Sequence, residues 1–268
     1  MADVKCLDIE ARLERVRDAC DFVVACAETT EMDERAVYHC QMAVDEALTN
    51  IIEHGFGFEG DDSTIEVCCE RDGNRFIITL IDESPAFNPL EHEAPDPDEP
   101  LDSREPGGWG IYFIRRLMNE VTYQRQDGKN QLTLVKEIPA GVESVPSGAS
   151  EADPVFPVRR LGDGAAVVSP TGRLDSNSSP DLERLLNMLL EEGQHWLFID
   201  MSDVTYIASS GLKILVSAWR RAQDQNGDVL LSGLQPRITE IFEMVGFDML
   251  FRIFPTLEAA LAAHSKSP

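Results

Sequence analysis

Residues 44–54 read Val-Asp-Glu-Ala-Leu-Thr-Asn-Ile-Ile-Glu-His and belong to a predicted helix over residues 33–54. Glu46 and Asn50 are four residues apart in this stretch, so a helix places their side chains next to each other on one face. A carboxylate beside an amide oxygen can coordinate a hard cation such as Mg²⁺, and the carboxylate can also accept a proton from a hydroxyl. The same spacing occurs on ordinary solvated helix faces, so this pair alone leaves both interpretations open.

Two further segments favour a nucleotide site. Asp82 ends an apolar predicted strand, where its carboxylate can accept a hydrogen bond from an exocyclic amine such as that of adenine. Gly107, Gly108 and Gly110 open a predicted helix over residues 110–118. Glycines at such a position let backbone N–H groups and the positive end of the helix approach phosphates closely. The order of helix, strand, long loop and glycine-rich helix start is more specific than any one of these segments.

The first half of the chain is predicted to be an α/β sandwich with a mixed, mostly antiparallel sheet. Its expected helices cover residues 9–27, 33–54 and 110–118, and its expected strands cover residues 64–70, 76–81, 121–125 and 131–137. The last two strands form a predicted hairpin that turns at Asp127 and Gly128, since this dipeptide favours tight turns between strands.

Residues 8–138 resemble the GHKL, or Bergerat-fold, ATPases, and within them the anti-sigma-factor serine kinases. The segments that carry the resemblance are residues 44–54, 107–121 and 132–136. It implies that ATP and Mg²⁺ are the cofactors and assigns one role to each matched position: general base for Glu46, Mg²⁺ ligand for Asn50, adenine contact for Asp82, phosphate contacts for Gly107, Gly108 and Gly110, and support of the adenine side for Thr133.

One position departs from this family. The family's adenine box has a glycine two residues after the aspartate, whereas this chain has Ser84. Because serine is small, we expect nucleotide binding to be weakened rather than abolished.

Charge and composition restrict the partners. The chain carries 23 basic and 48 acidic residues, a net charge of −25, which repels nucleic acid and anionic membranes and favours a protein partner with basic patches. No apolar run approaches the roughly 20 residues of a transmembrane helix. The first residues lack the basic flank and apolar stretch of a signal peptide, so the cytoplasm is the expected location.

The six cysteines all lie in the first half of the chain, at positions 6, 20, 26, 40, 68 and 69. None forms a CxxC pair, and no histidine stands at metal-ligand spacing from them. They are therefore expected to be reduced and mostly buried thiols.

Two domains are predicted, over residues 1–139 and 157–268, with a linker over residues 140–156 that is rich in Gly, Ser, Pro and acids. The second domain alternates strands and helices, which favours an α/β fold. Its strands are expected at residues 158–160, 165–169, 196–200, 229–232 and around 254, and its helices at residues 179–192, 210–224, 238–245 and 256–263.

Residues 197–212 place Ser209 and Ser210 between an apolar strand and a helix. Ser209 is a candidate helix N-cap, but a serine at such a corner is also accessible to a kinase, and a phosphate there would alter the binding surface. Residues 158–264 resemble the STAS domains, specifically the anti-sigma-factor antagonists. The resemblance implies that Ser209 is the phosphoacceptor and that Asp175 lies beside it, whereas Ala208 departs from an aspartate found in many members.

Together the two halves predict an ATP-dependent protein serine/threonine kinase in a partner-switching system. Its target would be a serine on a STAS domain: Ser209 of the same chain, Ser209 of a second copy, or a separate protein. The resemblance implies a sigma factor, a PP2C-type phosphatase and a second copy of the chain as further partners. In an alternative interpretation, Ser84 and Ala208 mark a nucleotide-dependent binding module with little turnover, capped by its own STAS domain.

Overall fold

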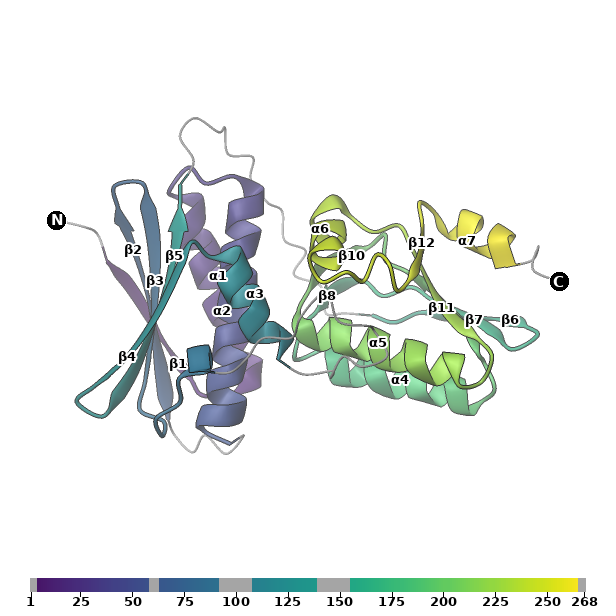
Figure 1. Ribbon diagram of the computed structural model, residues 1–268, viewed down its shortest axis with the longest axis horizontal. Helices are drawn as coiled ribbons and strands as arrows, with labels where there is room; N and C mark the ends of the chain where they lie inside the picture. Colours follow the sequence, from purple (N-terminus) through teal and green to yellow (C-terminus); the bar gives the residue numbers. More distant parts are fainter. Residues whose placement is uncertain (1–3, 58–62, 92–107, 139–154, 265–268) are drawn as a thin grey trace. The chain divides into compact units, whose positions relative to one another are not determined.

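The computed structural model describes residues 4–57, 63–91, 108–138 and 155–264. It divides into two compact units, the first containing the described residues up to 138 and the second those from 155 onward (Figure 1). The predicted linker at residues 140–156 lies outside the described residues except for its last two positions.

The first unit has an antiparallel sheet with the strand order β1-β2-β3-β5-β4. Its strands are β1 (Lys5–Glu10), β2 (Thr64–Asp72), β3 (Arg75–Asp82), β4 (Glu120–Gln126) and β5 (Lys129–Glu137). The predicted hairpin is confirmed: Asp127 and Gly128 both have positive φ and connect β4 to β5. A two-residue turn of this kind matches the right-handed twist of the strands.

Three helices cover one face of this sheet: α1 (Leu13–Glu28), α2 (Glu34–Asn50) and α3 (Trp109–Leu117) (Figure 1). The side chains of β3 alternate strictly between buried and half-buried, so every second one enters the core beneath the helices. The other face of the sheet is called the open face below. Helix α2 begins at Asp33, whose side chain accepts a hydrogen bond from Ala36 N, and nearly all of its residues are buried.

Two short helical segments complete the first unit, the π-helical η1 (Ile51–Gly55) and the 3₁₀-helical η2 (Pro89–Glu91). Segment η1 continues α2, and Phe56 N donates to Ile51 O at 3.0 Å. Single π turns of this kind are frequent at functional sites. Here the turn ends the long helix directly after Asn50.

The predicted helix over residues 9–27 was wrong at its start. Residues 5–10 form β1, an edge strand that pairs antiparallel with β2, and the helix begins only at Leu13. From Leu7 to Glu10 the sequence alternates apolar and polar residues, as a half-buried strand does. Ile9 enters the core and Asp8 and Glu10 face solvent, so the pairing with β2 decided the structure of this segment.

The expectation of six reduced thiols is also corrected. Cys6 and Cys68 form a disulfide between β1 and β2, with their Cα atoms 4.1 Å apart. They stand directly opposite each other in the strand register, so the sheet itself brings the two sulfurs together. The other cysteines are free and buried, as predicted: Cys20, Cys26, Cys40 and Cys69.

The second unit has a five-stranded mixed sheet in the order β12-β11-β9-β7-β6 and a parallel pair, β8 with β10. Its strands are β6 (Val158–Gly162), β7 (Ala165–Val168), β8 (Gly172–Leu174), β9 (Trp196–Asp200), β10 (Val204–Ile207), β11 (Asp228–Ser232) and β12 (Arg252–Phe254). Its helices are α4 (Ser179–Glu191), α5 (Ser209–Gln223), α6 (Pro236–Met244) and α7 (Leu257–His264).

Helix α7 packs through Ala260 onto one face of this sheet, against Phe198 and Leu230. Helices α4 and α5 lie on the opposite side of the sheet (Figure 1). Each predicted strand and helix of this unit is found within about two residues, but β8 and β10 were missed because each is only three or four residues long. Among the described residues no helix is long and apolar enough to span a membrane.

Candidate active site and serine corner

Helices α2 and α3 bring Glu46, Asn50 and Gly110 together. A Cβ atom built on Gly110 would lie 2.5 Å from Glu46 Oε2 and 3.3 Å from Asn50 Nδ2. A side chain at position 110 would therefore displace the Glu46 carboxylate from its present position. Glu46 is only 4% exposed. The side chain of Asn50 lies in the same place, and among the described residues its buried Nδ2 has no hydrogen-bond partner.

The start of α3 has the conformation that only a glycine adopts easily. Gly108 is the N-cap residue and has φ of 85°, in the left-handed region. The opposite end of α3 is held by Lys136 of β5, whose Nζ donates to Leu117 O at 2.6 Å. Gly107, the third predicted phosphate-binding glycine, lies outside the described residues.

Asp82 ends β3 and is 3% exposed. Its Oδ1 accepts hydrogen bonds from Ser84 N and from Asn130 Nδ2, both at 2.9 Å. Asn130 is itself held in place, because its Oδ1 accepts from Tyr123 Oη at 2.7 Å and from Arg125. One oxygen of the Asp82 carboxylate is thus held by Asn130 of β5 and by Ser84 of the loop that follows β3.

Thr133, predicted to support the adenine side, lies three residues along β5 from the residue that pairs with Asp82. In the register of β3 and β5, Thr133 pairs with Thr79, and both are half-buried on the open face. The residue opposite Asp82 is Asn130, which sequence reasoning missed. The sequence held no signal for it, because the strand that follows β3 in the chain is β4, whereas in the sheet β3 pairs with β5.

Ser84, the departure from the resembled family, is 2% exposed and fits against Gly55 of η1. A Cβ atom on Gly55 would lie 2.7 Å from Ser84 Oγ. The hydroxyl also accepts a hydrogen bond from Asn130 Nδ2 at 3.0 Å. The glycine at position 55 therefore leaves the space that the serine side chain fills.

The Gly55→Ala variant is expected to destabilise the first domain by about 1–3 kcal/mol, because the new methyl group overlaps the Ser84 hydroxyl. In a Ser84→Gly background the same substitution should cost much less, since the overlapping hydroxyl is gone. Urea unfolding of the two single variants and the double variant measures this coupling free energy. Strictly additive costs would show that the two side-chain positions do not compete for space.

Ser209 begins α5, directly after β10, and is half-buried. The N-cap residue Ala208 is buried and donates its N–H to Leu174 O at 2.8 Å. A Cβ atom on Gly211 would lie 2.9 Å from the same carbonyl oxygen, so glycine is needed for the first turn of α5 to pack against the end of β8. Ser210 Oγ accepts a hydrogen bond from Ser179 Oγ at 3.1 Å.

Asp175 follows β8 beside this corner and is 5% exposed. Its Oδ2 accepts from Arg173 Nε at 3.1 Å, and its Oδ1 accepts from the backbone N–H groups of Asn177 and Ser178. The guanidinium group of Arg173 lies 3.9 Å from the ring centroid of Tyr206 in β10. The hydrogen bonds of Asp175 thus fix the loop between β8 and α4, and Arg173 connects this loop to β10.

Residues 9–136 match the model of the histidine kinase-like ATPase domain, and residues 157–260 match the model of the STAS domain. The chain therefore joins two domains, a histidine kinase-like ATPase domain followed by a STAS domain. Its relatives include serine-protein kinases, which resemble the first half, and anti-sigma factor antagonists, which resemble the second half.

Serine/threonine-protein kinase BtrW of Bordetella bronchiseptica is 33% identical to this chain over 93 residues, which are 35% of this chain and 65% of that kinase. The chain thus spans slightly less than two thirds of this relative. The anti-sigma-B factor antagonist of Staphylococcus epidermidis is 27% identical over 82 residues, or 31% of this chain and 76% of that protein. A crystal structure of an anti-sigma factor antagonist from Mycobacterium paratuberculosis is 29% identical, with a TM-score of 0.40, and covers 43% of this chain and 97% of that one.

Proposed function

We propose that this chain is an ATP-dependent protein serine kinase that phosphorylates a serine on a STAS domain. The observation that carries the proposal is the close approach of Gly110 to Glu46 and Asn50. This approach places a buried carboxylate and a buried amide nitrogen at the N-terminus of α3, where Gly110 has no side chain. Asp82, at the end of β3, adds a buried carboxylate suited to an adenine amine.

The donor set fits Mg²⁺. This cation prefers oxygen ligands and keeps several waters, so one protein side chain together with ATP phosphates is sufficient. The amide of Asn50 offers such an oxygen and lies beside Gly110 at the start of α3. When bound, Mg²⁺ neutralises charge on the phosphates. Asn50 is the residue of this chain that would hold it.

Glu46 is suited to the role of general base. Its carboxylate would accept the proton of the attacking serine hydroxyl as the bond from Oγ to the γ-phosphorus forms. The bond between that phosphorus and the oxygen bridging to the β-phosphate breaks, and ADP leaves. The backbone N–H groups at the start of α3 would face the phosphates, where the positive end of the helix stabilises negative charge.

Ser209 is the proposed acceptor, in the same chain, in a second copy or in the equivalent position of a separate STAS protein. It is accessible at the start of α5, and phosphorylation adds about −1.5 to −2 charges to that corner. This change would alter the affinity between the STAS domain and the kinase domain. The proposed consequence is a change in the release of a sigma factor or a similar client.

Incubation of the purified chain with Mg·ATP, followed by intact-mass measurement, tests the proposal. We expect the gain of one phosphate, lost in both the Ser209→Ala and the Glu46→Ala variants. Ser202→Ala, at an exposed serine near the end of a strand, is the matched control and should keep the phosphate. Mixing an unlabelled Glu46→Ala chain with an isotope-labelled Ser209→Ala chain distinguishes transfer between copies from transfer within one chain. If ATP binds but no phosphate appears on this chain or on an added STAS protein, the chain is a nucleotide-dependent binding module instead.

A further inference from the structure

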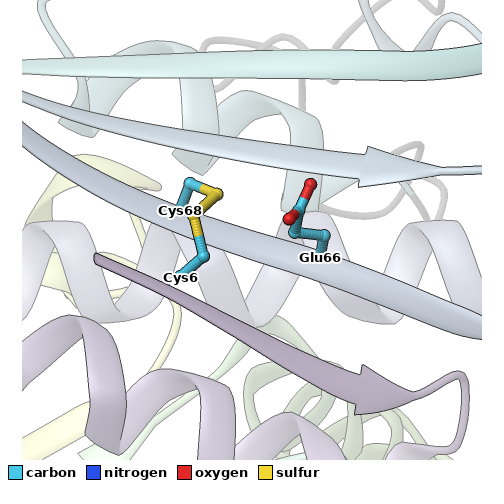
Figure 2. Close-up of side chains that lie close together, drawn as sticks. All are labelled: Cys6, Glu66 and Cys68. Atoms are coloured by element: carbon cyan, nitrogen blue, oxygen red, sulfur yellow. A yellow bond between two sulfur atoms is a disulfide. The ribbon is translucent and has the colours of Figure 1, made fainter. Parts of the chain in front are cut away.

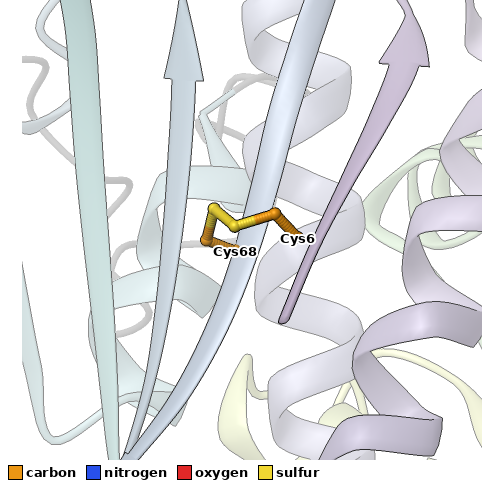
Figure 3. The surroundings of a disulfide bond; sticks show 2 residues. All are labelled: Cys6 and Cys68. Atoms are coloured by element: carbon orange, nitrogen blue, oxygen red, sulfur yellow. A yellow bond between two sulfur atoms is a disulfide. The ribbon is translucent and has the colours of Figure 1, made fainter. Parts of the chain in front are cut away.

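The disulfide between Cys6 and Cys68 lies on the open face of the first sheet, away from the helices (Figure 3). Cys6 is exposed on the edge strand β1, and Cys68 is half-buried on β2. The four free cysteines are buried. Cys6 and Cys68 are therefore the solvent-accessible cysteines among the described residues.

The free thiols are unreactive by comparison. Burial raises the pKa of the Cys40 thiol to about 12, an effect that the charge of Lys136 only partly opposes. Burial also raises the pKa of Cys69, which neighbours Cys68 but points into the core. Since thiolates bind metals and exchange with disulfides, the accessible pair Cys6 and Cys68 is better placed for such chemistry than the buried thiols.

Glu66 stands beside the pair. It precedes Cys68 by two residues, so it projects from the same face of β2, as Figure 2 shows. One ligand atom each from Cys6, Glu66 and Cys68 lies within 4.8 Å of the others. Asp8 of β1 is directly opposite Glu66 in the register. Like charges in this arrangement repel each other, and a bound cation would relieve that repulsion.

We propose that Cys6, Cys68 and Glu66 form a binding site for a thiophilic divalent cation, Zn²⁺ or one like it, which opens when the disulfide is reduced. Two thiolates and a carboxylate are ligands that Zn²⁺ accepts, with water in the fourth position. Hard cations such as Mg²⁺ prefer oxygen ligands alone. The strand pairing holds the ligands close together in both states, so little further ordering is needed to bind the cation.

The chemistry balances with a dithiol as the reductant. The disulfide takes up two electrons and two protons to give two thiols, while the dithiol becomes a disulfide. Binding of the cation then releases the two thiol protons to solvent. Oxidation by a disulfide of low molecular weight reverses the exchange, restores the Cys6–Cys68 bond and expels the cation. The site is independent of the proposed kinase activity, because Glu46 and Asn50 lie on the other side of the sheet.

Titration of the full chain with Co²⁺ tests the proposal, because thiolate–cobalt bonds absorb in the near ultraviolet. After reduction and removal of the reductant, we expect one Co²⁺ per chain, displaced by one equivalent of Zn²⁺. The oxidised chain should show no such absorption, and neither should a Cys6→Ser variant, whose substitution lies on the exposed face of an edge strand.

The Glu66→Gln variant should bind at least about 10-fold more weakly. Glu70→Gln is its matched control, because Glu70 lies on the same face of β2 and also two residues from Cys68. The proposal is overturned if the reduced chain shows no thiolate–cobalt band or if Cys6→Ser leaves the band unchanged. Equal effects of the two glutamine substitutions would remove Glu66 from the ligand set.

Discussion

The Glu46→Gln variant is expected to phosphorylate serine about 10²–10⁴-fold more slowly than the wild type, the usual contribution of a general base. Glutamine has nearly the same shape as glutamate, so the contact with Gly110 remains while the proton acceptor is lost. ATP affinity should change only a few-fold, because Asp82 and the start of α3 are untouched. Phosphate transfer at saturating Mg·ATP gives the rate, and equilibrium dialysis gives the affinity.

Glu28→Gln is the control for this variant, because it removes an exposed carboxylate at the end of α1. Its rate should equal that of the wild type. An undiminished rate in Glu46→Gln would exclude Glu46 as the base. A complete loss of ATP binding in the same variant would assign Glu46 to nucleotide binding rather than to proton transfer.

Loss of the disulfide is expected to lower the free energy of unfolding of the first domain by about 4 kcal/mol. Cys6 and Cys68 are 62 positions apart, so the bond closes a long loop and restricts the unfolded chain. A Cys6→Ser/Cys68→Ser variant and the oxidised wild type are compared by urea unfolding. Hydrogen exchange of peptides from β2 and β3 reports the transition of the first domain.

Peptides from β9 and β11 provide an internal control for this comparison, since they belong to the second unit and should show the same unfolding midpoint in both proteins. Added reductant should shift the wild type toward the variant and leave the variant unchanged. If the unfolding midpoints of β2 and β3 are identical in the two proteins, the disulfide does not stabilise the first domain.

The predictions that held depended on residues close together in the chain. Glu46 and Asn50 share a helix face because of their four-residue spacing, and α2 places both where predicted. Asp127 and Gly128 turn the hairpin because their backbone angles suit a two-residue connection. Gly108 starts α3 for the same kind of local reason.

The predictions that failed depended on pairings between distant segments. Asn130, the residue opposite Asp82, was missed; it is three residues from Thr133 along β5, and such a shift changes the face on which a side chain lies. Asn130 has that place through the register of β3 with β5. The predicted helix began too early, at residue 9, because the prediction did not include the pairing of residues 5–10 with β2.

The sequence by itself determined the two domain types, the helix that carries Glu46 and Asn50, and the serine corner at Ser209. The helix and the corner follow from local periodicity and the order of strand and helix, which operate over a few residues, and the domain types follow from the resemblance that their motifs carry. Only the tertiary structure decided that Gly55 makes room for Ser84, that Asn130 holds Asp82, and that Cys6 meets Cys68. The physical reason is that strand register and helix packing result from many contacts made together, and no single segment contains that information.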